Sequence, residues 1–172
     1  MCIRDRITEE GIRYITKLPK LEWLNLYKTK INNRSLKEIA KIKSLKLLPI
    51  GSTKVTDEGM THLSTMTQLE YLGLRGNLIT DIGTSQLSPL INLQGLNLGE
   101  TRISDESLKN ISKFTNLQNL WVQKTEVSDN SIPIITNFKK LKKLDISSTK
   151  ITSEGIKTIK SKLPNCEITS GD

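Results

Sequence analysis

The sequence is poor in the residues from which catalytic sites and aromatic cores are usually built. Aromatic residues make up 4% of the 172 residues, and there are one histidine and two cysteines. Cys2 and Cys166 provide neither a disulfide framework nor the spacing of a metal site. No run of about 18 or more apolar residues occurs, so no membrane-spanning helix is predicted. We expect a single domain whose core is built from Leu and Ile.

The formal net charge of +8 is unevenly distributed. Residues 17–54 contain ten Lys and Arg and residues 139–162 contain eight, whereas residues 55–138 contain five against nine acids. A basic surface that binds nucleic acid or an anionic surface is therefore one alternative function. A chain rich in Ile, Asn and Lys is also typical of an AT-rich genome, which we favour as the explanation.

No set of side chains in the sequence forms a catalytic group. The one histidine, His62, lies between Met60 and Leu63 on an expected helix, without a visible nucleophile. We interpret the acidic residues at 57, 58, 105, 106, 129 and 154 as helix starts, and the glycines at 11, 59, 83 and 155 as small positions where helices pack. We predict that the chain is not an enzyme and has no metal site or cofactor.

A repeat of about 24 residues runs through the chain. The stretch LQGLNLGETRISDESL at 93–108 has the same pattern as LQNLWVQKTEVSDNSI at 117 and LKKLDISSTKITSEGI at 141. Strand phrases of the form LxxLxL begin at Leu21, Leu45, Leu69, Leu93, Leu117 and Leu141. Residues two apart share one face of a strand, so each phrase turns two leucines inward and the residue between them outward.

The rest of each unit has a structural explanation. The ninth position is Thr or Asn, and we expect it to hydrogen-bond the backbone of adjacent coils. Ser104 is predicted to cap a helix whose first turn contains Asp105 and Glu106. Apolar pairs three apart, such as Leu108 and Ile111, form the inward face of that helix. Because each coil covers its neighbours, stability is expected to be cooperative between nearest neighbours.

The unit LxxLxLxx(T/N)x(I/V)(T/S)(D/E)xGIxxIxxLxx resembles a leucine-rich repeat. The resemblance covers Ile7 to about Ile168. The unit is most similar to bacterial repeats related to the cysteine-containing class, with Thr or Asn at the position that is Cys or Asn in that class. It implies an α/β fold, namely a leucine-rich-repeat solenoid (horseshoe) with a parallel concave sheet and convex helices. We expect about six full repeats, with a partial unit in front and an irregular unit, SKLPNCEI, behind.

The first six residues, MCIRDR, do not fit the repeat, which starts at Ile7. The string resembles the translation of a transposase sequencing-adapter end, as found in metagenomic assemblies. We therefore predict that residues 1–6 are not native, and that residues 7–172 are a leucine-rich-repeat domain from a longer protein. An ordinary irregular N-terminal tail is the alternative.

Two residues depart from the pattern. Thr84 takes the first inward position of its helix, where a buried hydroxyl without a partner costs about 1–3 kcal/mol. That helix is expected to be looser or to find a local hydrogen bond. Pro49 lies in the strand phrase LKLLPI and has no N–H to donate, so the sheet should be weakest there.

The outward residues of the strands are the candidate binding residues, because the fold does not require them. Trp23, Leu47 and Tyr71 are expected to form an apolar stripe, with Tyr27 beside its first member and strands about 4.8 Å apart. Glycines at 51, 73, 76, 95 and 99 should leave low ground between this stripe and Trp121. Arg75, with Glu22, Glu70 and Glu100, should flank it. The predicted partner-binding residues are Trp23, Tyr27, Leu47, Tyr71, Arg75 and Trp121.

These residues predict a scaffold that binds a protein or peptide on the concave face, as a monomer. Two alternatives compete for the aromatic residues: upstream coils of a longer chain could cover Trp23 and Tyr27, and scattered exposed aromatics need no explanation. A further alternative for the whole chain is a non-catalytic targeting arm of a larger enzyme. The family has too many functions for the fold alone to choose among them.

Overall fold

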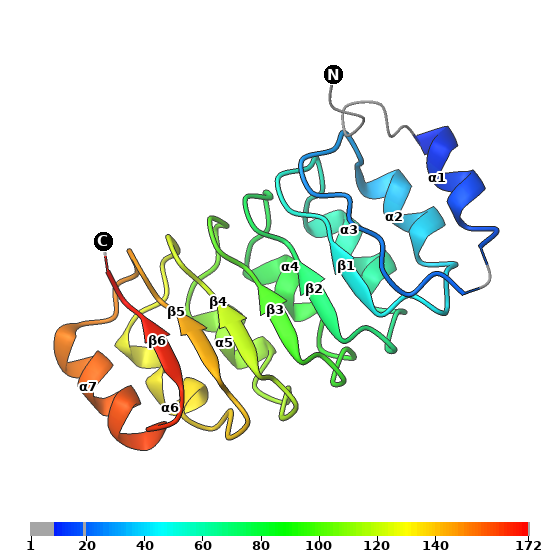
Figure 1. Ribbon diagram of the computed structural model, residues 1–172. Helices are drawn as coiled ribbons and strands as arrows, with labels where there is room; N and C mark the ends of the chain where they lie inside the picture. Colours follow the sequence, from blue (N-terminus) through cyan, green and yellow to red (C-terminus); the bar gives the residue numbers. More distant parts are fainter. Residues whose placement is uncertain (1–8, 19, 172) are drawn as a thin grey trace.

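The computed structural model describes residues 9–18 and 20–171, which form a right-to-left succession of similar coils (Figure 1). Strands line one side of the coils and helices the other. The helices are α1 (Glu9–Ile15), α2 (Asn33–Ile39), α3 (Asp57–Leu63), α4 (Asp81–Ser85), α5 (Asp105–Asn110), the 3-10 helix η2 (Asp129–Ser131), α6 (Ile132–Ile135) and α7 (Ser153–Lys162). The strands are β1 (Leu47–Pro49), β2 (Tyr71–Gly73), β3 (Gly95–Asn97), β4 (Asn119–Trp121), β5 (Lys143–Asp145) and β6 (Glu167–Thr169).

The six strands form one parallel sheet in chain order, and each residue pairs with its equivalent one repeat later. The predicted α/β solenoid with a parallel sheet is confirmed. In the described part of the chain, no helix is long and apolar enough to cross a membrane. The predicted boundary between residues 6 and 7 lies outside the described residues.

The membership of the sheet differs from the prediction at both ends. The phrase at Leu21 contributes only an isolated bridge, Trp23 to Leu47. The last strand, β6, comes instead from the irregular segment SKLPNCEI, where Leu144 pairs with Ile168. The pattern of leucines is lost there, but the parallel register with β5 is kept.

Pro49 explains why pairing is weakest at the first coil. The backbone N–H of Leu26 donates to the carbonyl oxygen of Pro49 over 2.9 Å. Pro49 cannot donate in return, because its ring nitrogen carries no hydrogen. The coil that contains Leu26 is therefore joined to β1 by a bridge and not by a three-residue ladder.

One hydrophobic core runs through the described coils from Ile12 to Leu163. The strand leucines, such as Leu96 and Leu98, are fully buried, as are the helix residues Leu108 and Ile111. Phe114 and Phe138 are also buried and depart from the expected Leu and Ile core. Burying each such side chain stabilises the fold by roughly 1.5–3 kcal/mol relative to leaving it exposed.

Thr84 is fully buried but has hydrogen-bond partners. Its hydroxyl lies 2.9 Å from the Ser107 hydroxyl and donates to the Asp81 carbonyl oxygen over 3.0 Å. The side-chain amide of Asn110 donates to it over 3.2 Å. Of the two expectations for this position, the local hydrogen bond is the one that the structure supports.

The ninth position behaves differently from the prediction. The hydroxyls of Thr29, Thr125 and their equivalents donate to a carbonyl three residues earlier in their own coil. The Thr53 hydroxyl also donates to Asn77 Oδ1 of the next coil over 3.1 Å. Asn77, whose amide is longer, does bridge adjacent coils. Its Nδ2 donates to the Ile50 carbonyl over 2.9 Å, and its Oδ1 accepts from the Thr53 N–H over 2.8 Å.

Adjacent coils are instead clamped by the aspartate that begins each of α3, α4, α5 and η2. Asp105 Oδ1 accepts from the Ser128 N–H over 2.8 Å, and Oδ2 accepts from the Ser128 hydroxyl over 2.6 Å. The Ser131 hydroxyl donates to Asp105 over 2.5 Å. Asp57, Asp81 and Asp129 accept the same pair of bonds, from the backbone N–H and hydroxyl of Thr80, Ser104 and Thr152 respectively. We call this the aspartate clamp.

The clamp also explains the glycines at the repeat position after each helix start. A Cβ at Gly83 would clash with Asp57 Oδ1, and one at Gly155 would clash with Asp129 Oδ1. Where serine takes this position, at 107 and 131, its hydroxyl donates to the aspartate. Gly83 and Gly155 therefore make room for a carboxylate of the preceding coil, and Gly59 makes room for the Asn33 side-chain amide, which is more specific than the helix packing expected from the sequence.

The clamp predicts that stability falls in acid. Partial burial by itself would raise the pKa of Asp81 and of Asp105, but hydrogen bonds from Ser104, Ser107, Ser128 and Ser131 outweigh it and lower both pKa values. A lowered folded-state pKa contributes stability above the unfolded value of about 3.9, and this is lost as pH falls through the folded value. We expect the free energy of unfolding, measured by urea titration, to fall below about pH 4. It should fall less steeply in Asp81→Asn/Asp105→Asn, and equal slopes in the two proteins would contradict this.

Candidate functional site

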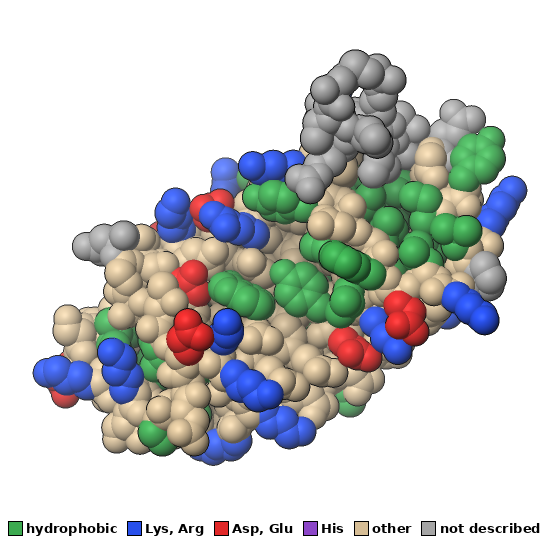
Figure 2. All heavy atoms as spheres, in the orientation of Figure 1, with side chains coloured by type: hydrophobic (Ala, Val, Ile, Leu, Met, Phe, Trp, Pro, Cys, Tyr) green, Lys and Arg blue, Asp and Glu red, His purple; other side chains and the backbone are tan. Residues whose placement is uncertain are grey.

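The open sheet face is the surface formed by the outward residues of the strands and of the coil at 21–27. The strand register places these residues in rows, as predicted. One row is Trp23, Leu47, Tyr71, Gly95, Asn119 and Lys143, and the next contains Pro49, Gly73, Asn97, Trp121 and Asp145. Figure 2 shows hydrophobic side chains gathered in the middle of the molecule, with basic and acidic side chains on either side.

Tyr71 and Trp121 lie in contact on this face. Their ring centroids are 6.3 Å apart and the rings meet edge to face at 76°. A Cβ at Gly95 would lie 2.7 Å from Tyr71 Cδ2, and one at Gly73 would lie 3.1 Å from the Tyr71 hydroxyl oxygen. The Tyr71 ring thus lies over both glycines. The low ground expected between the stripe and Trp121 is therefore wrong at Gly95, where the Tyr71 ring fills it.

A hollow of about 230 Å³ lies on the other side of Tyr71. Its lining consists of Asn25, Tyr27, Pro49, Gly51, Tyr71, Gly73, Arg75 and Asn97. A Cβ at Gly51 would lie 2.7 Å from the Arg75 carbonyl oxygen and 3.1 Å from the Tyr27 ring. The hollow therefore exists because Gly51 and Gly73 have no side chains between the two tyrosine rings. We call it the tyrosine hollow.

Charged residues form a chain beside the hollow, at the ends of the strands. Arg75 Nη2 lies 2.8 Å from Glu100 Oε1, and Lys124 Nζ lies 3.4 Å from the same oxygen. The hydrogen bond between Arg75 and Glu100 raises the pKa of Arg75 and lowers the pKa of Glu100. Glu100 and Lys124 both adopt a positive φ, 56° and 55°, in the turn after their strands. Arg75 Nε is buried and has no hydrogen-bond partner among the described residues.

Tyr71 is half-buried by its contacts. Burial raises the pKa of the Tyr71 hydroxyl, and a hydrogen bond with Asn97 partly opposes the increase. The ring lies against Gly73 and Gly95. Its exposed edge and the half-buried Trp121 form a fixed aromatic surface next to the tyrosine hollow.

The structure places the six predicted binding residues in three settings. Tyr27, Tyr71 and Arg75 line the tyrosine hollow, and Trp121 contacts Tyr71. Leu47 is 37% exposed and joins Trp23 to Tyr71. Trp23 is 64% exposed, lies at the first coil of the sheet and does not line the hollow. Of the flanking acids, Glu100 pairs with Arg75, whereas Glu22 pairs with Lys46 at 3.1 Å.

A second set of residues is, apart from Glu70, not predicted as a site from the sequence. Gln68, Asn92 and Asn116 form one row, and Glu70, Gln94 and Gln118 form another, at the edge of the sheet where the strands begin. The sequence does contain a signal for these two rows, since both recur once per repeat. Amides at such positions also serve loops, so the recurrence alone does not identify a site.

The helix side offers no comparable constellation. Within the described residues, no group of three or more His, Cys, Asp and Glu is placed to hold a metal ion. His62 is half-buried on α3, where its carbonyl accepts from the Thr65 hydroxyl over 2.9 Å. Several acids expected only to start helices form the aspartate clamp. That the chain is not an enzyme stays a prediction.

Comparison with known proteins supports the repeat architecture. Residues 139–160 match the family model described as Leucine Rich repeat. The solved structure of internalin C2 from Listeria monocytogenes is similar, with a TM-score of 0.70 and 26% sequence identity over 94% of this chain and 74% of that chain. A second internalin from the same organism, inlF, has a TM-score of 0.55 and 17% identity, over 92% of this chain and 56% of its own, and shows the fold alone. No curated protein sequence matches.

Proposed function

The chain is a leucine-rich-repeat protein, and we propose that it is an interaction scaffold that binds a protein partner on the open sheet face. The leucine-rich-repeat fold supports an interaction scaffold in general terms. The observation that carries the finer proposal is the Tyr71 and Trp121 pair beside the tyrosine hollow. Neither ring serves the hydrophobic core, so the fold does not account for them.

The shape and chemistry of this surface fit a protein loop or an extended segment. The tyrosine hollow, at about 230 Å³, has room for one side chain rather than for a separate small molecule. Aromatic residues and arginine are the types that contribute most to protein interfaces. Because Arg75 is already paired with Glu100, the surface offers hydrogen bonds and stacking without a large net charge.

A basic surface for nucleic acid has less support. In the basic C-terminal region, Lys143 lies 3.6 Å from Glu167, and Lys150 and Lys157 also pair with glutamates. These pairs reduce the charge available to phosphates, on which such binding depends. Whether the chain is the targeting arm of a larger enzyme, and whether it is a monomer, stay predictions.

The location of the binding surface can be tested without a known partner. Peptides selected from a phage-displayed library against this chain should bind the most complementary surface. We expect two-dimensional NMR spectra to show that they shift the Trp121 indole resonance and the amides of β2 to β4. The amides of α3 to α7 should be unaffected. Perturbations confined to the helices would count against the open sheet face.

A further inference from the structure

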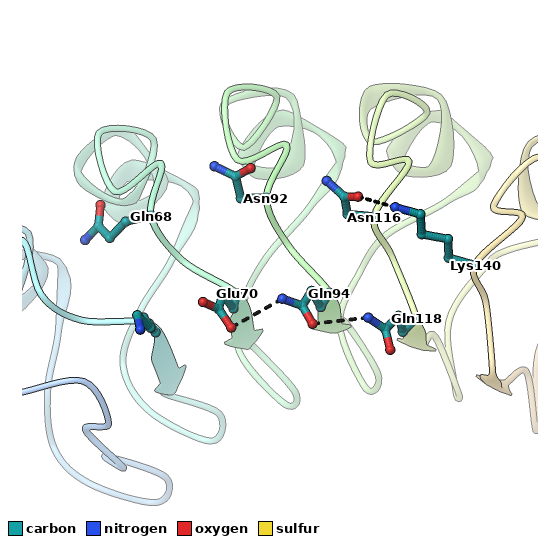
Figure 3. A pocket seen from close by; sticks show the side chains of 8 residues that line it. Gln68, Glu70, Asn92, Gln94, Asn116, Gln118 and Lys140 are labelled. Carbon is teal, nitrogen blue, oxygen red and sulfur yellow. Dashed lines mark hydrogen bonds between the residues drawn. The ribbon is translucent and has the colours of Figure 1, made fainter.

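A polar groove of about 560 Å³ crosses the coils at the edge where the strands begin. Figure 3 shows its two rows of side chains: Gln68, Asn92 and Asn116 near the ends of the preceding helices, and Glu70, Gln94 and Gln118 directly before the strands. Lys46 and Lys140 also line it. The groove lies at the opposite ends of the strands from the Arg75 and Glu100 pair, so it is separate from the tyrosine hollow.

Hydrogen bonds between coils hold both rows in place. Gln118 Nε2 donates to Gln94 Oε1 over 3.1 Å, and Gln94 Nε2 donates to Glu70 Oε2 over 3.3 Å. In the other row, Asn92 Nδ2 donates to the Thr67 carbonyl over 2.8 Å. Gln68 and Asn116 make the equivalent bond over 3.4 Å. The side chains are therefore ordered before any ligand arrives, which reduces the entropy cost of binding.

The atoms left available in the groove include both donors and acceptors. Each amide uses one N–H for a bond within the protein, and its second N–H makes no hydrogen bond to the described residues. Gln68 Oε1, Asn92 Oδ1 and Gln118 Oε1 accept no hydrogen bond from this part of the chain. Glu70 Oε1 is likewise without a donor in this part of the chain. A ligand that fits must bring several groups that both donate and accept, spaced along the direction in which the coils repeat.

The charged side chains of the groove are of both signs, and each has a hydrogen-bond or ion-pair partner. Lys46 lies 3.1 Å from Glu22, and Lys140 Nζ donates to Asn116 Oδ1 over 2.7 Å. Gln94 donates to the Glu70 carboxylate. With Glu22, the two lysines of the groove are balanced by two glutamates, so there is no excess of one sign that would select an anion or a cation.

We propose that the polar groove binds a neutral, linear oligosaccharide. Each sugar hydroxyl both donates and accepts, so the hydroxyls along a sugar chain match the free N–H and carbonyl groups of the two rows. The lining contains no aromatic or aliphatic residue, so it offers no pocket for the side chains of a peptide. The groove runs from the coil of β1 to the coil of β5, roughly 19 Å at about 4.8 Å per strand. Binding should therefore strengthen with chain length until the groove is filled.

The test is an array of linear glucose, mannose, xylose, galactose and N-acetylglucosamine chains of one to eight sugars, with acidic chains for comparison. We expect at least one neutral series to bind, with longer chains binding more tightly and little dependence on salt. Glu70→Ala/Gln118→Ala should weaken binding roughly 5- to 100-fold, because two hydrogen bonds are lost. Asn137→Ala, an exposed amide on the helix side, should bind like the parent protein.

Three results would overturn the proposal: no neutral chain binds, only acidic chains bind and salt abolishes their binding, or the double variant binds as tightly as the parent. Unfolding curves of both variants verify the fold. Titration of the parent with the bound sugar, followed by the side-chain amide resonances of Gln94 and Gln118, gives an independent measure. Tyr71→Ala should leave sugar binding unchanged, which separates this groove from the open sheet face.

Discussion

Asp105→Ala is expected to destabilise the protein by about 3 kcal/mol, since hydrogen bonds to a charged group contribute roughly 1.5–3 kcal/mol each and are not additive. Asp105 accepts from the Ser128 N–H, the Ser128 hydroxyl and the Ser131 hydroxyl. Ser131 is fully buried, so its hydroxyl would lose its partner without gaining water. Because the three bonds join two coils, the loss falls on the interface between neighbours on which a solenoid depends. Urea unfolding followed by circular dichroism measures the change.

Glu106→Ala is the matched control for this prediction. Glu106 is the next residue of the same helix turn, and its side chain is 56% exposed and pairs with Lys109. Exposed pairs of this kind contribute about 0.3–0.5 kcal/mol. If the two variants unfold at the same urea concentration, the aspartate clamp does not stabilise the interface between coils.

Tyr71→Ala and Trp121→Ala are each expected to weaken a peptide bound on the open sheet face by about thirtyfold or more. Residues that anchor an interface cost about 2 kcal/mol or more when truncated, and every 1.4 kcal/mol is about a factor of ten. The two rings are in contact, so their effects should not add: the double variant should bind little more weakly than either single variant. Titration calorimetry with the peptides selected from the library measures these affinities.

Tyr14→Ala is the control, because Tyr14 is 66% exposed on α1, on the helix side. Its affinity for the peptide should equal that of the parent protein. Circular dichroism should show that the two single variants, the double variant and the control variant are all folded, as neither Tyr71 nor Trp121 belongs to the hydrophobic core. Parent-like affinity in the double variant would exclude the aromatic pair as the binding surface.

Much of the fold was predictable because the same pattern recurs in each coil. The alternation of LxxLxL determines which residues face inward, and the register between strands follows from stacking identical coils. The last strand was less visible, since Glu167–Thr169 lacks the leucines of the other phrases and is held by its pairing with β5. The aspartates were recognised as helix starts, but their partners lie in the following coil.

For the candidate site, the sequence predicts the row in which each residue lies but not which side chains are in contact. Strand alternation correctly predicts that Trp23, Tyr71 and Trp121 lie on the open sheet face. The direction in which the Tyr71 ring leans depends on the absence of side chains at Gly73 and Gly95. The sequence shows both glycines, but it does not determine whether a neighbouring ring fills the space above them. The hollow therefore lies between Tyr27 and Tyr71, over Gly51 and Gly73 of the expected glycines, and does not extend to Trp121.

By itself the sequence determined the solenoid, its pitch of one coil per repeat and the residues that face out from the sheet. These follow from the short-range alternation of the strand and from the repeated apolar pattern. Only the tertiary structure decided the aspartate clamp, the contact of Tyr71 with Trp121 and the polar groove. Each joins side chains of different coils, and whether such side chains meet depends on rotamers and on the space that the adjacent coil leaves.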